Sequence, residues 1–258
     1  MSVVFVHGIP ETPKVWDLLA ARLSEGGHDD QTRLSPPGFG AAVPNGFGAT
    51  VFDYRDWLIG ELEHFEDPVD LVGHDLGGGL CVIVAMTRPD LIRSWCSDAI
   101  GLFDPDYVWH RYAKIWQTPV VGEASIALYR MEPAAKRAAP QISMGMEPAI
   151  ATEVAAAFDA QMGRCILQMY RSAVQPVMAN LGANLEDATT RPGLLIMPSE
   201  DHAVGTDEQR RRSAIRAGAR VEVLQGSGHW WMTEDEGRRG SAVLDAFWSS
   251  LANGKVSK

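Results

Sequence analysis

The feature that most constrains the fold of this chain is a short apolar run that ends in one acidic residue among glycines, at residues 71–79 (LVGHDLGGG). The apolar run predicts a buried strand, the glycines predict a sharp turn, and the apolar residues after them predict a helix. Such a turn holds its central residue, Asp75, in a strained backbone conformation. Glycine leaves out the side chains that would collide there, at Gly73, Gly77 and Gly78. We therefore expect the Asp75 carboxylate to stand exposed at the end of a strand.

The Gly-x-Asp-x-Gly pattern around Asp75 has the form of a nucleophile elbow, in which hydrolases more often carry serine. An ionised carboxylate attacks an sp3 carbon without a base to activate it, and water can then hydrolyse the resulting ester at its carboxyl carbon. A serine that attacked the same carbon would leave an inert ether. The aspartate therefore favours a substrate carbon that bears a strained or good leaving group. The alternative is that Asp75 only caps the following helix, as Asp often does.

The composition narrows the class of protein. The 258 residues fit one large α/β domain, or a core with an insertion. A net charge of -10 argues against nucleic acid and anionic membranes as partners and leaves a small-molecule substrate open. The chain starts directly with an apolar strand and contains no stretch of membrane-spanning length. We therefore expect neither a signal peptide nor a membrane anchor.

The three cysteines, Cys81, Cys96 and Cys165, are odd in number and widely spaced. This pattern predicts neither a disulfide framework nor a zinc site, and it favours free, buried thiols in a reducing cytoplasm. We expect a cytoplasmic protein that uses no metal and no cofactor. The sequence leaves open whether the chain forms a homodimer.

Strand and helix patterns alternate in the first and last parts of the chain, and this alternation is absent from the middle segment. In the first half, the pattern predicts strands at 3–6, 31–34 and 93–100 in addition to the strand before Asp75. It predicts helices at 15–23, 53–65 and 79–86. The second half predicts strands at 193–197 and 220–224, and helices at 207–217 and 236–251. The middle segment is helical in pattern and is interrupted by prolines. We predict a mostly parallel sheet flanked by helices, with core segments 1–102 and 186–258 and an inserted helical cap at 103–185.

A nucleophile needs a base and an acid close to it, and two further residues are placed for these roles. Both follow predicted strands, and open α/β sheets place their sites at the carboxyl ends of the strands. Asp201 follows the first strand after the insertion, and His229 follows the last strand. The chain order Asp75, Asp201, His229 is the nucleophile, acid, histidine order of α/β-hydrolases. In such a set His229 deprotonates water, while Asp201 orients the imidazole and stabilises its cation. Other candidates for the acid are Glu200, Asp98 and Asp104.

Two motifs resemble the aspartate-nucleophile branch of the α/β-hydrolase superfamily, which contains epoxide hydrolases and haloalkane dehalogenases. Residues 7–11 (HGIPE) are similar to the epoxide hydrolase motif HGxPE. Residues 73–78 (GHDLGG) resemble the family's GHDWGG motif, with Leu76 in place of Trp. The resemblance covers nearly the whole chain and implies the α/β-hydrolase fold. It also implies an oxyanion hole built from the backbone N–H groups of Ile9 and Leu76.

Epoxide hydrolases also use two tyrosines of the lid, which hydrogen-bond the epoxide oxygen and protonate the departing alkoxide. Residues 112–119 (YAKIWQTP) resemble the family's YxxxFQxPG stretch, which assigns the first role to Tyr112. Residues 167–171 (LQMYR) are similar to its LNWYR stretch, which assigns the second role to Tyr170. The alternative is that both rings only pack the lid against the core.

Several aromatic and basic residues remain. Candidates for an apolar substrate pocket are Trp109, Trp116 and Trp230. Trp109-His110 also invites comparison with the halide or carboxylate pocket of fluoroacetate dehalogenases. Those enzymes need arginines just after the nucleophile, where this chain has Leu76 and Leu80. The arginine run at 210–212 is expected to be a solvated helix face.

The resemblance makes epoxide hydrolysis the leading functional hypothesis, with a small hydrophobic epoxide opened to a vicinal diol through an alkyl ester on Asp75. One alternative is a haloalkane or haloacid dehalogenase, which shares the nucleophile. Dehalogenases bind the leaving halide through a Trp at the position of Leu76 and often through an Asn at that of Ile9, and neither side chain here can hydrogen-bond a halide. The other alternative is a non-catalytic, ligand-binding homologue of the same fold.

Overall fold

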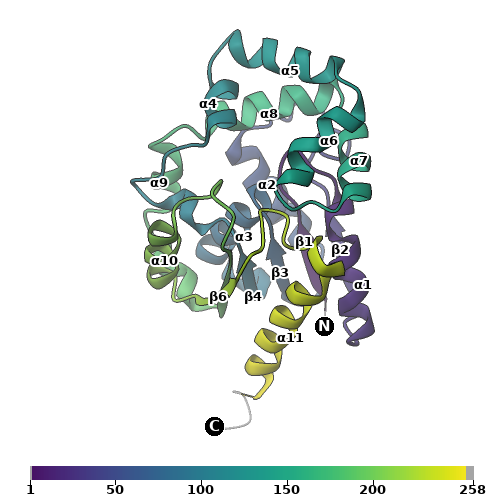
Figure 1. Ribbon diagram of the computed structural model, residues 1–258. Coiled ribbons are helices and arrows are strands. Elements are labelled where there is room, and N and C mark those ends of the chain that lie inside the picture. The colour runs from purple at the N-terminus through teal and green to yellow at the C-terminus, as the bar shows by residue number, and fades with distance from the viewer. Residues whose placement is uncertain (1, 254–258) are drawn as a thin grey trace.

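The fold is built on one parallel β-sheet of six strands. The computed structural model describes residues 2–253 (Figure 1). The strands are β1 (Val3–Val6), β2 (Gln31–Leu34), β3 (Val69–Gly73), β4 (Ile92–Ser97), β5 (Gly193–Pro198) and β6 (Arg220–Leu224). They lie in the order β2-β1-β3-β4-β5-β6, and all neighbouring pairs are parallel. The prediction of an α/β fold with a parallel sheet is confirmed.

Helices cover both faces of this sheet, so the central strands are buried on both sides. In β1, Val3 and Phe5 belong to one hydrophobic cluster while Val4 and Val6 belong to the other, because successive side chains of a strand point to opposite faces. One face packs against α1 (Asp17–Glu25) and α11 (Arg238–Asn253). The other face packs against α2 (Val51–Leu62), α3 (Leu76–Thr87) and α10 (Asp207–Arg216).

Six α-helices occupy the described chain between β4 and β5, and we call them the inserted helices. They are α4 (Arg111–Gln117), α5 (Val121–Met131), α6 (Ala134–Ser143), α7 (Pro148–Ala156), α8 (Ala160–Ser172) and α9 (Val177–Leu181). In Figure 1, α4 to α8 gather at one end of the molecule, away from both chain ends. Short 3-10 helices complete the structure: η1 (Pro13–Trp16), η2 (Pro89–Leu91), η3 (Ile100–Phe103), η4 (Leu185–Thr190) and η5 (Glu234–Gly237).

Most predicted elements lie where the sequence pattern places them, and the differences occur at element ends. The strand predicted at 93–100 is shorter, because β4 ends at Ser97 and residues 100–103 form the 3-10 helix η3. The helix predicted at 53–65 begins earlier, at Val51, because the side chain of Thr50 accepts a hydrogen bond from the backbone of Asp53 and caps it. The helix predicted at 79–86 begins at Leu76 and includes the glycines of the turn. The division into segments 1–102, 103–185 and 186–258 stays a prediction.

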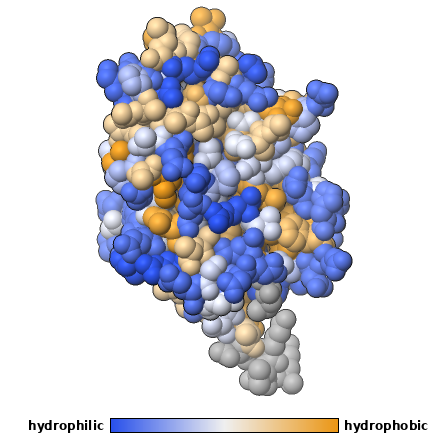
Figure 2. All heavy atoms as spheres, turned by 90° about the vertical axis from the view of Figure 1, so that its right-hand side faces the viewer, coloured by the Kyte–Doolittle hydropathy of each residue, from blue (hydrophilic) through white to orange (hydrophobic). Residues whose placement is uncertain are grey.

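The surface is of mixed polarity, and the cysteines are free and buried as expected. Figure 2 shows hydrophilic and hydrophobic residues interspersed over the face that it displays. The three cysteines are free and buried. Among the described residues no helix has both the length and the apolar character that a membrane span requires.

Candidate active site

Asp75 lies at the bend between β3 and α3 with a backbone conformation of φ 51° and ψ -119°, which is strained for a residue with a side chain. Its side chain does not cap α3. Instead Oδ1 accepts a hydrogen bond from the backbone N–H of Ile9 at 3.1 Å. The loop after β1 approaches so closely that a Cβ on Gly8 would lie 2.4 Å from the Cβ of Asp75. The side chain of Asp75 therefore does not cap α3 and is bound to the loop after β1 instead.

The two predicted partners of Asp75 lie beside it. Asp201 follows β5, and its Oδ2 accepts a hydrogen bond from Nδ1 of His229 at 3.0 Å. The other ring nitrogen of His229, Nε2, lies 3.9 Å from Oδ2 of Asp75. The tertiary structure thus brings together three residues that are separated by 126 and 28 positions in the chain. The other candidate acids have different partners: Glu200 contacts Ser199, Asp104 pairs with Arg212, and Asp98 binds His74.

Burial and charge set the protonation of these three groups. Burial raises the pKa of Asp75. Burial alone would lower the pKa of His229, but the carboxylate of Asp201 outweighs it and raises that pKa above its ordinary value. Burial alone would raise the pKa of Asp201, and the charge and hydrogen bond of His229 instead hold it well below its usual range. Asp201 therefore stays ionised, and its charge makes His229 a stronger base.

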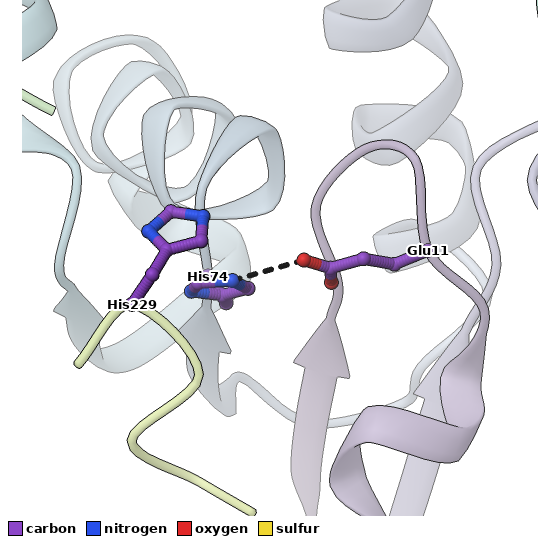
Figure 3. A group of neighbouring side chains, drawn as sticks. All are labelled: Glu11, His74 and His229. Atoms are coloured by element: carbon purple, nitrogen blue, oxygen red, sulfur yellow. Dashed lines mark hydrogen bonds and ion pairs between the residues drawn. The ribbon is translucent and has the colours of Figure 1, made fainter. Parts of the chain in front are cut away.

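A second buried histidine, His74, lies next to this set with both ring nitrogens bound to carboxylates. Nδ1 donates to Oδ2 of Asp98 at 2.6 Å, and Nε2 donates to Oε1 of Glu11 at 3.0 Å. Figure 3 shows the Glu11 carboxylate pointing at the ring of His74, with His229 on the other side of that ring. Two indole N–H groups complete the cluster: Trp230 donates to Glu11 at 2.5 Å and Trp231 donates to Asp98 at 2.7 Å. We call these five residues the His74 cluster.

The His74 cluster is charged and helps to hold the turn at Asp75 in place. Burial alone would lower the pKa of His74, but Asp98 and Glu11 raise it well above its ordinary value. Burial alone would raise the pKa of Glu11, and the charge of His74 instead lowers it to about 2. The raised pKa favours the protonated form of the ring, which donates to both carboxylates. Asp98 also accepts the backbone N–H of Asp75 through Oδ1 at 2.9 Å, which fixes the strained turn.

Glu11, His74 and His229 each offer a ligand atom within 4.8 Å of the others, which is a spacing that some metal sites have. A histidine that binds a metal needs a nitrogen without a proton. His74 holds a proton on each nitrogen because both are donated to carboxylates and its pKa is raised. These three residues therefore fit a hydrogen-bond network and not a metal site.

An apolar pocket opens in front of Asp75 and contains two of the predicted site residues, Trp109 and Tyr170. The rest of the lining comes from α2, α3, η3, the end of α8 and α9: Val51, Leu76, Gly79, Leu80, Ile83, Leu102, Met169, Ala173 and Met178. Trp109 is held by a hydrogen bond from its indole to the carbonyl of Ala173 at 3.1 Å. Most of this lining is apolar.

Three predicted site residues lie elsewhere. Tyr112 is 54% exposed and stacks on Trp116, with ring centroids 6.0 Å apart, so it does not line the pocket. Trp116 packs against Tyr170, with ring centroids 4.9 Å apart, and does not line the pocket. The indole of Trp230 points to Glu11, as part of the His74 cluster. The helix α4 turns Tyr112 outward, and this orientation depends on packing that the motif itself does not encode.

Sequence reasoning missed two residues of the site. His110 precedes α4, and its Nε2 lies 3.5 Å from the hydroxyl of Tyr170. Arg210, expected on a solvated face, is fully buried and donates to the backbone carbonyl of Asp201 at 3.0 Å. No feature of the arginine run at 210–212 distinguishes Arg210 from its neighbours. His110 does have a sequence signal, because it forms an aromatic pair with Trp109 in the predicted cap.

Comparisons with known proteins place the chain in a family. A model described as the Alpha/beta hydrolase family matches residues 3–240. A curated relative from Acinetobacter baylyi, (E)-2-((N-methylformamido)methylene)succinate hydrolase, is 31% identical over 93 residues. That match covers 35% of this chain and 34% of the relative, so only about a third of its length is matched.

Solved structures agree with this placement. A Pseudomonas aeruginosa protein described as a proposed epoxide hydrolase has a TM-score of 0.73 at 18% identity, and the match covers 98% of this chain and 89% of that one. A loop variant of a haloalkane dehalogenase from Bradyrhizobium elkanii has a TM-score of 0.70 at 20% identity, with 98% and 91% covered. At these identities the likeness shows the fold and not the reaction. Because the family model spans most of its length, the chain belongs to the alpha/beta hydrolase family.

Proposed function

We propose that this hydrolase opens a small hydrophobic epoxide to a vicinal diol through an ester on Asp75. The observation that carries the proposal is the place of this carboxylate: it borders an apolar pocket, and His229 Nε2 lies 3.9 Å from its Oδ2. That separation is longer than a hydrogen bond. A histidine at this distance can activate a water that attacks an ester formed on Asp75.

In the first half-reaction, a carboxylate oxygen of Asp75 attacks an epoxide carbon. The ring C–O bond breaks, and its electron pair moves to the epoxide oxygen. Tyr170, which lines the same pocket, gives its hydroxyl proton to this oxygen. Burial raises the pKa of Tyr170, so the phenol is protonated at neutral pH and available as a donor.

In the second half-reaction, His229 takes one proton from water, and the water oxygen attacks the carboxyl carbon of the ester. The oxyanion that forms accepts hydrogen bonds from the backbone N–H groups of Ile9 and Leu76. Support for this comes from Ile9, which already donates to Asp75 Oδ1. When the acyl C–O bond breaks, His229 returns its proton to the departing diol oxygen. The second proton of the water restores Tyr170, and Asp75 is again a carboxylate.

Carbon–halogen hydrolysis is the second candidate, because a haloalkane dehalogenase has the same fold and an attack by Asp75 on carbon suits either substrate. A leaving halide needs hydrogen-bond donors. Within the pocket the side chain of Leu76 offers none, and the indole N–H of Trp109 already donates to Ala173. The hydroxyl of Tyr170 is left as a donor, and its proton is needed by a departing alkoxide but not by a departing halide. Epoxide hydrolysis is therefore the better supported reaction, and the set of Asp75, His229 and Asp201 argues against a non-catalytic homologue.

A single turnover in water labelled with 18O tests the proposal, with styrene oxide as substrate and mass spectrometry of the peptide that contains Asp75. One label is expected in the Asp75 carboxylate and none in the diol, because water attacks the carboxyl carbon. A label found only in the diol would mean direct attack by water and would contradict the covalent mechanism. Halide release from haloalkanes, without turnover of any epoxide, would establish the second candidate instead.

A further inference from the structure

We propose that His110 is a positioning residue for ring opening: its Nε2–H donates to the hydroxyl oxygen of Tyr170 and so directs the Tyr170 proton to the substrate. This inference rests on the proposed function and assigns a role to a lid residue that has no direct contact with the substrate oxygen in the proposed reaction. Its starting observation is the contact of 3.5 Å between His110 Nε2 and the Tyr170 hydroxyl.

The tautomer of His110 follows from its place at the start of α4. Its Nδ1 accepts a hydrogen bond from the backbone N–H of Ala113 at 3.3 Å and caps the helix. A nitrogen that accepts a hydrogen bond carries no proton. Burial lowers the pKa of His110 to about 4, so the ring is neutral at pH 7. The single ring proton is therefore on Nε2, the atom that faces Tyr170.

The surroundings of Tyr170 leave its hydroxyl proton free to donate into the pocket. Its ring is 3% exposed and is fixed between Trp109 and Trp116, at ring distances of 5.3 and 4.9 Å. Within residues 2–253 His110 is the one hydrogen-bond partner of its hydroxyl. When the oxygen accepts from His110, the O–H is left to donate into the pocket. The same bond stabilises the phenolate that forms as the proton moves to the substrate oxygen.

Two substitutions separate the hydrogen bond to Tyr170 from the helix cap. His110→Asn keeps an acceptor where Nδ1 caps α4, but its side chain is too short to reach Tyr170. His110→Gln places an N–H near the position of Nε2 and loses the cap. Tyr112→Phe is the matched control, since Tyr112 is exposed and outside the pocket.

The measurement is the single-turnover rate of Asp75 alkylation by styrene oxide, together with the rate of ester hydrolysis. His110→Asn is expected to slow alkylation by about 10- to 100-fold, the effect of one lost hydrogen bond in the transition state. His110→Gln should stay within about 3-fold of the wild type, and ester hydrolysis should be unchanged in all variants. Slow alkylation in His110→Gln with a normal rate in His110→Asn would show that the residue only caps α4, and would overturn the proposal.

A second measurement does not depend on turnover. NMR of protein labelled with 15N-histidine at pH 7 reports which ring nitrogen carries the proton, and comparison with His110→Asn assigns the signal. A proton on Nε2 is expected, and a proton on Nδ1 would overturn the proposal. If no epoxide alkylates the wild type, the proposed reaction fails, while the NMR result still decides the hydrogen bond between His110 and Tyr170.

Discussion

The two buried histidines beside Asp75 have rings only 4.5 Å apart, yet their surroundings give them opposite properties. Both nitrogens of His74 are bound to carboxylates. His229 has one nitrogen bound to Asp201, and its other nitrogen faces Asp75 without a hydrogen bond. A histidine with two carboxylate partners is held in its protonated form and fixes structure, whereas one with a free nitrogen can take up and release a proton. The number of carboxylate partners, more than burial, therefore separates a structural histidine from a base.

This difference predicts that changes around His229 and Asp75 affect the reaction, while changes in the His74 cluster affect stability. The physical reason is the cost of an unpaired buried charge. Removing one member of the His74 cluster leaves its partner charged and desolvated. Removing His229 leaves Asp201 near Arg210, whose guanidinium still lies beside it.

Asp75→Asn is expected to have the largest effect. An amide is a far weaker nucleophile, so diol formation should fall by about 10⁴-fold. The melting temperature should stay close to that of the wild type, because Asn tolerates positive φ at this turn. Rapid-quench assays of diol release measure the loss. A variant that still forms diol at the wild-type rate would remove Asp75 from the reaction.

His229→Gln should act on the second half-reaction alone. Without a base the ester is not hydrolysed, and turnover should fall by about 10³-fold. The ester on Asp75 should accumulate and be visible as a mass increase of one substrate. No substitution in the His74 cluster is expected to trap the ester, so this accumulation distinguishes His229 from His74. Equal slowing of both half-reactions would argue against the role of His229 as the base.

Glu11→Gln should lower the free energy of unfolding by about 3 kcal/mol at pH 7, because it leaves the charge of His74 with one anion. The lowered pKa of Glu11, about 2, means that its carboxylate stabilises the fold above the unfolded-state pKa near 4.5. That contribution is lost as the pH falls through about 2. Urea unfolding should therefore show a gap between wild type and variant that is full at pH 7 and closes in acid. A gap that does not change with pH would contradict the charge argument.

Asp201→Asn is expected to lower the rate of ester hydrolysis by about 10²-fold and to move its pH dependence. The wild-type rate should rise with pH through the raised pKa of His229, since only the neutral ring accepts a proton. Without the Asp201 carboxylate that pKa falls, so the rise should occur at lower pH. A midpoint that stays in place or moves up would show that Asp201 does not set the basicity of His229.

Leu76→Trp should have the smallest effect. Leu76 lines the pocket, and an indole there would fill space beside Asp75. We expect kcat/KM for styrene oxide to fall by about 10-fold and that for propylene oxide to change less, as an overfilled pocket discriminates by size. If both substrates respond alike, Leu76 does not determine how much room the pocket offers.

Local patterns predicted the parts of the site that depend on local geometry. The strands 3–6, 31–34 and 220–224 have the predicted bounds, and β3 ends at the predicted turn. Parallel strands bring their carboxyl ends to one edge, so Asp75, Asp201 and His229 were predictable as neighbours. The helix starts were less accurate, because caps such as Thr50 and the glycine turn decide the first residue.

The inserted helices show where prediction from sequence ends. A motif placed Tyr112 in the site, but the packing of α4 leaves it exposed and brings His110 to Tyr170 instead. Likewise Trp230 was predicted to line a pocket, and its indole binds the buried acid Glu11. In both cases the side chain's direction depends on contacts between segments far apart in the chain.

The strained aspartate turn and the parallel sheet follow from the chain's local pattern, because the sterics of glycine and the apolar runs of strands and helices act over a few positions. Which charged groups are paired depends on the folded structure. Whether a buried histidine has one or two carboxylate neighbours depends on strands and loops that meet only after folding. That pairing makes His74 a fixed cation and leaves His229 a nitrogen free to face Asp75.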